Sequence, residues 1–168
     1  NEAALEILNS GIDIDLEMVT SINSPRFGLH LMDTNKDLNN HTRVAKTFTV
    51  RGDSTLTTAS PGGQILAAAA EGALLENAGQ VSLRGMEFRD NQTGIRVVNT
   101  LDIGGTLNVL DDQFLQLFGI NMFDSDFVGV VTTNLTELDI RDSLFDNNGD
   151  VANADNETLL LLYTERPN

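Results

Sequence analysis

The chain has 168 residues, of which 40% are hydrophobic, and no cysteine. One domain with a real core is therefore expected, while disulfides, cysteine-based zinc sites and thiol nucleophiles are excluded. A formal charge of −15 argues against nucleic-acid partners, and the lack of a run of about 18 uncharged apolar residues argues against membrane insertion.

The first predicted strands follow a pattern that recurs along the chain. Ile14 and Leu16 alternate with acidic residues, Ile22 follows as a single large apolar residue, and Gly28 precedes a second alternating pair. Alternation with a period of two predicts short strands with one apolar face. The polar residues 32–47 that follow predict a loop excursion, the kind of segment that often forms a binding face.

The same pattern returns four more times, with glycines spaced 25 to 35 residues apart. That spacing is too irregular for helical repeats but natural for coils joined by loops of variable length. Residues 64–76 fit either a helix, because of their alanines, or a strand, because Gly72 opposes a helix. In these four copies the large apolar residue is Leu56, Phe88, Phe114 and Phe145, and the glycine is Gly63, Gly94, Gly119 and Gly149.

Strands this short cannot bury an apolar face alone, but equivalent strands from successive coils can stack and enclose a common core. Parallel strands joined by crossovers wind right-handed. We therefore predict an all-β fold, a right-handed parallel β-helix or solenoid of about five to six irregular coils, over residues 1–168 as a single domain. Because the chain starts at Asn1 in mid-repeat, we expect it to belong to a longer chain or assembly. A β-sandwich is the alternative.

Two segments carry a resemblance to a known family. Residues 81–97 read VSLRGMEFRDNQTGIRV and residues 138–149 read LDIRDSLFDNNG. Both resemble the right-handed parallel β-helix repeats of the pectate-lyase-like superfamily, which includes polysaccharide lyases and hydrolases, phage tailspikes and surface adhesins. The resemblance implies contact with a polymer or a structural role, without choosing between them.

Enzymes on this scaffold act through clustered carboxylates on one flank, with calcium or a basic residue in some of them. If the chain is an enzyme, the resemblance implies Asp111, Asp142 and Arg141 as the catalytic residues. A structural interpretation competes with this one, because Asp and Asn are also ordinary turn residues. Further acids at comparable positions are Asp90, Asp112 and Asp146, and further basic partners are Arg84, Arg89 and Arg96.

Calcium needs six to eight oxygen ligands, and the densest sources are Asp124, Asp126, Asp146 and Asp150. No EF-hand or calcium nonapeptide pattern is present, so this site is the weaker alternative to having no cofactor. His30, which falls between two apolar residues of a predicted strand, and His41 are both expected on the solvated surface.

Two short motifs are also interpreted as structural. Residues 51–53 spell an Arg-Gly-Asp adhesion tripeptide, which we interpret as a turn because Arg84 and Gly85 hold the same place in another copy. Glycosylation sequons indicate no more than exposed loops. They begin at Asn40, Asn91, Asn134 and Asn156.

These observations favour a non-catalytic extracellular or cell-surface module with a structural or adhesive role. Open coil ends favour self-association end to end into a fibre, and the flanks are expected to contact a carbohydrate or a surface protein. The alternative is a polysaccharide lyase or glycoside hydrolase that uses aspartates on one flank.

Overall fold

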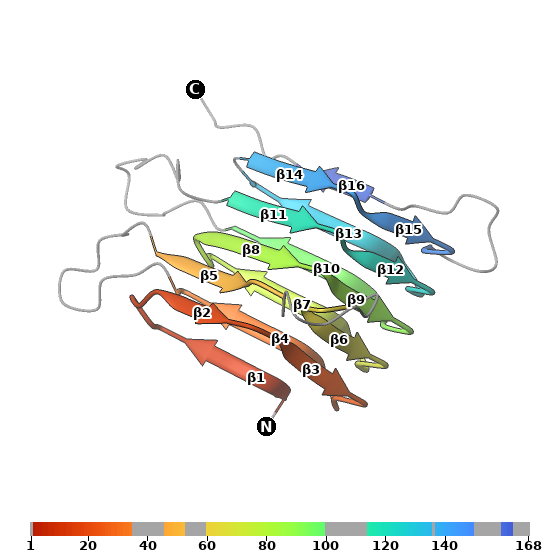
Figure 1. The fold of residues 1–168 in the computed structure, drawn as a ribbon, viewed down its shortest axis with the longest axis horizontal. Coiled ribbons are helices and arrows are strands. Elements are labelled where there is room, and N and C mark those ends of the chain that lie inside the picture. The colour runs from red at the N-terminus through yellow and green to blue at the C-terminus, as the bar shows by residue number, and fades with distance from the viewer. Residues whose placement is uncertain are drawn as a thin grey trace.

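The computed structural model describes residues 2–34, 46–52, 60–99, 114–135 and 137–149, and the backbone of 159–162. These residues form strands and turns (Figure 1), and among them no helix is long and apolar enough to cross a membrane. The strands belong to three parallel sheets, which we call sheets A, B and C.

Sheet A has six strands and sheets B and C have five each. Sheet A contains β1 (Ala3–Leu8), β4 (Phe27–Met32), β7 (Glu71–Glu76), β10 (Thr93–Val98), β13 (Val128–Thr133) and β16 (Leu159–Leu162). Sheet B contains β2 (Ile14–Leu16), β5 (Thr47–Val50), β8 (Gln80–Arg84), β11 (Phe114–Phe118) and β14 (Glu137–Arg141). Sheet C contains β3 (Val19–Ile22), β6 (Gly63–Leu66), β9 (Met86–Arg89), β12 (Asn121–Phe123) and β15 (Leu144–Asp146).

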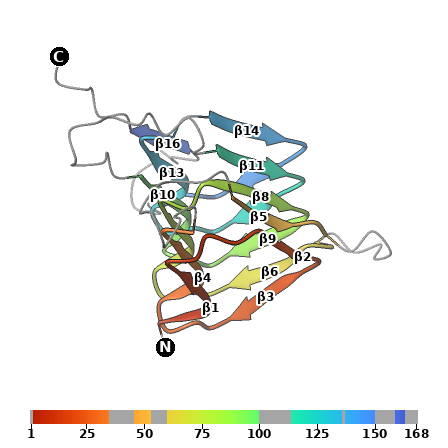
Figure 2. The same ribbon diagram turned by 90° about the vertical axis from the view of Figure 1, so that its left-hand side faces the viewer.

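The described strands follow one another through the three sheets in a fixed order, A then B then C. Neighbours within a sheet are therefore three strands apart in sequence, as β5, β8 and β11 are in sheet B, and they pair in parallel. Figure 2 shows equivalent strands lying one above another. The prediction of an all-β fold of stacked parallel strands, compatible with a parallel β-helix, is confirmed.

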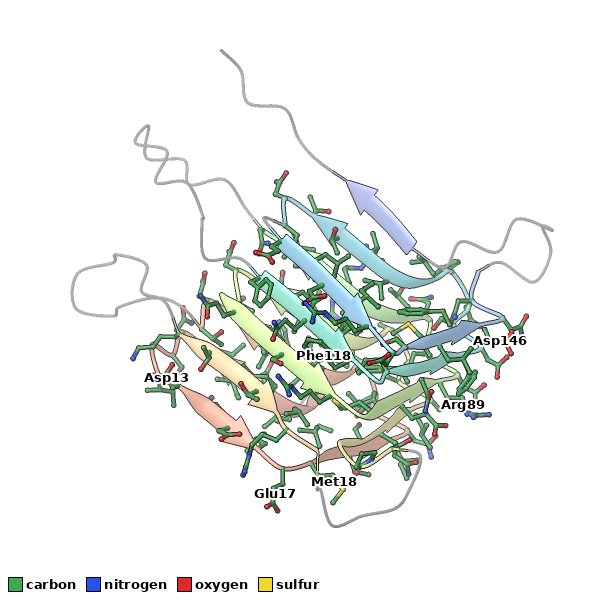
Figure 3. The ribbon with its side chains drawn as sticks, turned by 45° about the horizontal axis from the view of Figure 1, so that its top comes forward. Asp13, Glu17, Met18, Arg89, Phe118 and Asp146 are labelled. Carbon is green, nitrogen blue, oxygen red and sulfur yellow. The ribbon has the colours of Figure 1, made fainter. Side chains whose placement is uncertain are left out.

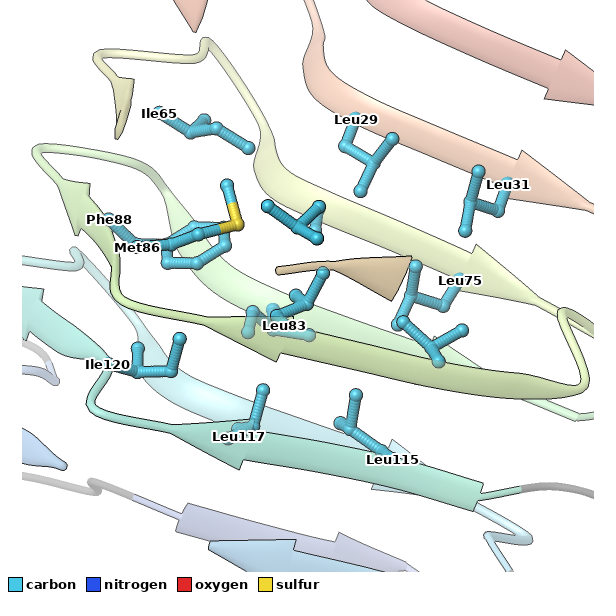
Figure 4. Close-up of a cluster of buried hydrophobic side chains, with 14 of the residues drawn as sticks. Leu29, Leu31, Ile65, Leu75, Leu83, Met86, Phe88, Leu115, Leu117 and Ile120 are labelled. Atoms are coloured by element: carbon cyan, nitrogen blue, oxygen red, sulfur yellow. The ribbon is translucent and has the colours of Figure 1, made fainter. Parts of the chain in front are cut away.

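The core lies between the three sheets and is built from columns of apolar side chains (Figure 4). In sheet B, Val50, Leu83 and Leu117 are in register and fully buried. In sheet C, Ile65 and Phe88 form a similar column. Each inward side chain packs against its equivalent in the next strand, so each fully buried Leu, Ile or Phe contributes roughly 1.5–3 kcal/mol of transfer free energy.

Turn residues in left-handed conformation separate the sheets, as the Asn, Asp and Gly pattern predicted. Four turns from sheet B to sheet C contain such a residue, with positive φ at Gly52, Gly85, Gly119 and Asp142, whereas the turn between β2 and β3 contains none. The turns from sheet C to sheet A begin with another, at Asn23, Ala67, Asp90, Asp124 and Asn147.

Buried asparagines tie two of these turns to the coil before them. The Asn91 side chain accepts a hydrogen bond from the backbone N–H of Ala68 at 2.9 Å and donates to the carbonyl of Ile65 at 3.1 Å. Asn148 makes the same pair of bonds to Ser125 and Met122. Each amide thus satisfies backbone groups that would otherwise be buried without partners.

The predicted repeat is correct in the third copy and slipped by one strand in two others. In the third copy Phe88 lies in β9 and Gly94 in β10, as the pattern implied. In the second copy, however, Gly63 opens β6 of sheet C, and in the fourth Gly119 forms a B-to-C turn. Both slipped copies contain long segments outside the described residues, 53–59 and 100–113, which include Leu56.

Two further expectations are settled by the strands. Residues 64–76 form no helix, because they contain most of β6 and all of β7. Ile22 was expected inside but is 56% exposed, while Ser21 takes the inward position and is buried. Of the predicted loop 32–47, residues 35–45 lie outside the described residues.

Candidate functional site on the outer face of sheet B

The outer face of sheet B has an uncharged centre. Thr49, Ser82 and Gln116 lie in register on β5, β8 and β11 and are half-buried. The edge strands differ, because β2 and β14 present Asp15 and Asp139 at the same register position. In a chain with 25 acidic residues, three adjacent strands without an acid on this row form a distinct surface.

A shallow hollow of about 190 Å³ lies over these three strands. Among the described residues the Ser82 hydroxyl has no hydrogen-bond partner, although its oxygen is buried. Hydroxyl and amide groups beside an aromatic ring suit a ligand that is itself rich in hydroxyl groups. The lining residues are Thr47, Thr49, Gln80, Val81, Ser82, Arg84, Phe114 and Gln116.

An aromatic ring lies between two arginines, one of which, Arg84, lines the hollow. The Arg84 guanidinium carbon lies 4.9 Å from the centroid of the Phe118 ring, and that of Arg141 lies 5.4 Å from the same centroid. Figure 3 shows Phe118 on this face. Cations over an aromatic face are attracted to it, so the ring holds both guanidinium groups close to the sheet.

The arginines of this row differ in their ionic partners. Arg51 lies 2.8 Å from Asp15, and Arg141 lies 2.8 Å from Asp139. The hydrogen bond to Asp139 raises the pKa of Arg141 above its ordinary value. Arg84 has no carboxylate within ion-pair distance among the described residues.

Sheet C carries a related arrangement that is internally paired. Arg89 stacks over Phe123 of the next strand at 4.7 Å and donates to Glu87 at 2.8 Å. The hydrogen bond to Glu87 raises the pKa of Arg89. Glu87 therefore neutralises the Arg89 guanidinium, which could otherwise bind an anionic ligand.

Asp13 fixes one rim of the hollow (Figure 3). Its carboxylate accepts the backbone N–H of Thr47 at 3.0 Å and the Thr47 hydroxyl at 3.2 Å. Lys46 lies 3.1 Å from the other oxygen. The backbone hydrogen bond from Thr47, followed by the bond from Lys46, lowers the pKa of Asp13.

His30 corrects the expectation of a solvated histidine. It points outward from sheet A but is only 8% exposed, because it lies between two carboxylates and beside Phe27. Its Nδ1 is 3.1 Å from Glu6 of β1, and its Nε2 is 2.8 Å from Glu76 of β7. The group joins three strands of sheet A, and its neighbours leave both ring nitrogens occupied. His41 lies outside the described residues.

Scans against family models, curated proteins and solved structures found no match.

Two of the three predicted catalytic residues, Arg141 and Asp142, lie within the described residues and are neighbours in the chain. Arg141 ends β14 and is paired with Asp139, while Asp142 forms the next turn with a φ of 50°. Asp90 forms a turn at the opposite end of sheet C, so it lies on a different corner from Asp142. Asp111 lies outside the described residues, as does Asp112.

Two of the calcium candidates lie close together, because the backbone N–H of Asp124 donates to the carbonyl of Asp146 at 3.3 Å. Asp124 accepts a hydrogen bond from the Asn147 side chain at 2.6 Å, and Asp146 is exposed at the end of β15. Within the described ranges, no three His, Asp or Glu side chains are placed to hold a metal ion. Asp126 is exposed in the next turn, and Asp150 lies outside those ranges.

The two short motifs also have structural places. Arg51 is paired with Asp15, and Gly52 has a φ of 78°. Val50 is in register with Leu83, so Arg51 and Gly52 hold the places of Arg84 and Gly85, as the turn interpretation implied. Asn91 contradicts the expectation of exposed sequons, because it is fully buried and hydrogen-bonded. Asn134 is half-buried and bonded to Asn99, while Asn40 and Asn156 lie outside the described residues.

The sequence interpretation missed the row formed by Thr49, Ser82 and Gln116. Polar residues that alternate with apolar ones were assigned to solvent as a class. A signal was nevertheless present, because VSLR at 81–84 and LDIR at 138–141 align with serine in the place of aspartate.

Proposed function

We propose that this chain is a non-catalytic module with a structural and adhesive role in an extracellular or cell-surface protein. The proposed architecture is a right-handed parallel β-helix of about five to six coils, similar to those of the pectate-lyase-like superfamily. In this proposal the coil stack holds the outer face of sheet B rigid, and that face contacts an extended carbohydrate. The role needs no cofactor.

The uncharged centre of sheet B carries this proposal. Thr49, Ser82 and Gln116 repeat a hydrogen-bonding group on successive strands, which are spaced about 4.8 Å apart. A row of donors and acceptors on a rigid sheet complements a polymer that repeats hydroxyl groups along its length. Phe114 lines the hollow and offers an apolar surface to a sugar ring of that polymer.

A binding screen with surface variants tests the proposal. Soluble neutral and charged polysaccharides are titrated against the chain by calorimetry, and the best binder is repeated with Gln116→Ala and Thr49→Val. We expect each variant to weaken binding at least fivefold. Gln64→Ala, on the outer face of sheet C, serves as the control and is expected to have no effect. Equal binding by all three variants would overturn the assignment of this face.

The same screen distinguishes an enzyme from a binding module. Analysis of the sugars after incubation is expected to reveal intact polymer. Release of shorter products that is lost in Asp142→Asn would replace this proposal with a polysaccharide lyase or glycoside hydrolase.

Association end to end into a fibre is the second part of the proposal. The first strand of each sheet has no described neighbour on one side, and its inward residues Leu5, Ile7, Ile14 and Leu16 are only partly buried. Another coil from a second copy would cover them. Analytical ultracentrifugation is expected to detect association that Leu5→Lys weakens, and a monomer at all concentrations would contradict it.

A further inference from the structure

An acid followed two positions later by arginine occurs on two strands of the solenoid. In β9 Glu87 pairs with Arg89, and in β14 Asp139 pairs with Arg141, each at 2.8 Å. Residues two apart on a strand lie on the same face, so the acid neutralises the arginine that follows it. Both arginines also lie over a phenylalanine of a neighbouring strand.

Strand β8 has the same arrangement without the acid. Gln116 of β11 is in register with both Ser82 and Asp139, and Phe118 is in register with both Arg84 and Arg141. Ser82 therefore occupies the place that Asp139 takes in β14. The consequence is visible on both side chains: the Ser82 hydroxyl has no partner, and Arg84 has no ion pair among the described residues.

The position of Arg84 suits it to an external anion. Its guanidinium is held over Phe118, is exposed, and borders the hollow that Ser82 also lines. A planar guanidinium presents a fork of donors that matches a carboxylate or sulfate, and Ser82, unlike an acid, leaves that fork unneutralised. Elsewhere on these sheets the protein supplies the carboxylate itself.

We propose that Arg84 binds an anionic group of the ligand, a carboxylate or sulfate, which takes the role that Asp139 has for Arg141. The ligand is then an acidic carbohydrate whose charged group contacts Arg84 while its ring lies in the adjacent hollow. This inference rests on the proposed function, because it names the chemical class of the ligand that the outer face of sheet B takes.

Three probes with one backbone test the proposal: dextran, carboxymethyl-dextran and dextran sulfate, titrated at fixed ionic strength. We expect at least one anionic derivative to bind the wild type at least tenfold more tightly than dextran. Ser82→Asp supplies the missing carboxylate and should abolish that preference, as should Arg84→Gln. Circular dichroism of each variant checks that it is folded.

Arg89→Gln is the matched control, since it removes an equal charge from an arginine that also lies over a phenylalanine, but one on sheet C that is already paired with Glu87. It should retain the preference within about twofold. Equal loss in Arg84→Gln and Arg89→Gln would reduce the effect to general charge and overturn the inference. Dextran binding that matches the anionic derivatives and persists in Arg84→Gln would overturn the inference but leave the proposed function standing. Failure of both anionic probes to bind also overturns the inference, while the wider polysaccharide screen decides the function separately.

Discussion

The strand pairs β8–β11 and β9–β12 carry the same arrangement on two sheets. In both, an arginine lies over a phenylalanine in register on the next strand, at 4.9 Å for Arg84 and Phe118 and at 4.7 Å for Arg89 and Phe123. They differ two residues before the arginine, where β9 has Glu87 and β8 has a serine. In β9 the arginine is paired with the carboxylate of Glu87, and we call this the closed arrangement. In β8 Arg84 has no ion pair among the described residues, and we call this the open arrangement.

The position of each charge relative to its neighbours, and not the composition alone, therefore decides what a polar face of these sheets can bind. Ion pairs such as Glu87–Arg89 are partly exposed and stabilise the fold little, but they remove a cation from the binding surface. A single change from acid to serine therefore converts a self-satisfied pair into a surface that can bind an anion.

The largest expected effect concerns Gly85, which joins β8 to β9 and so sets the two arrangements relative to each other. Gly85 and Gly119 have similar φ angles, 58° and 60°, but a Cβ on Gly85 would lie 2.6 Å from the Pro61 ring, whereas that on Gly119 would make only an ordinary contact, with the Gly85 nitrogen at 3.9 Å. Gly119→Ala should cost about 1–2 kcal/mol from the backbone alone. Gly85→Ala should cost about 1–3 kcal/mol more, because of the added overlap.

Urea unfolding of both variants measures this difference in the free energy of unfolding. Equal losses would mean that the Pro61 ring moves away freely and that the β8–β9 turn is not tightly packed.

A smaller effect is expected when the closed arrangement is opened. Glu87→Gln removes the partner of Arg89 and should lower the free energy of unfolding by only about 0.3–1 kcal/mol, since the pair is partly exposed. It should also create weak binding of carboxymethyl-dextran on sheet C. Glu137→Gln, an exposed acid of β14 without an ion pair among the described residues, is the control for the change of net charge. Binding gained by both variants, or by neither, would contradict the idea that Glu87 keeps Arg89 from binding an anion.

The smallest effect concerns the rim of the open arrangement, where Asp13 holds Thr47. The pKa of Asp13 is lowered in the folded state, so its contribution to stability is present above its unfolded pKa and is lost as the pH falls through the folded one. The wild type should therefore be more stable than Asp13→Asn at pH 7, and the two melting temperatures should converge below about pH 4. A difference that persists at pH 2 would show that the carboxylate charge is not its cause.

The strands and turns were largely predictable, because period-two apolar patterns and left-handed Asn, Asp and Gly are local signals. The third copy illustrates this, with β8, β9 and β10 at the expected places. The alignment between copies was less predictable. Gly63 and Gly119 matched the local pattern but belong to other places in the coil, since insertions of unequal length precede or follow them.

The candidate site was not predictable for a related reason. Ser82 and Gln116 are 34 positions apart in sequence, and only the strand register places them side by side. Likewise His30 was expected in solvent, because the two carboxylates that cover it come from β1 and β7. Contacts between coils depend on loop lengths, which no local pattern determines.

The register of sheet B decides whether the binding face exists, because its residues meet only if these strands align. The chain has no cysteine, so introduced pairs report without interference. Thr49→Cys combined with Ser82→Cys places two Cα atoms about 4.8 Å apart on β5 and β8, within the range for a disulfide, whereas Thr49→Cys with Arg84→Cys places them about 8 Å apart. Mass spectrometry after mild oxidation should detect the cross-link in the first pair and not in the second. A cross-link in the second pair alone, or in neither, would contradict the stacked register and the binding face built on it.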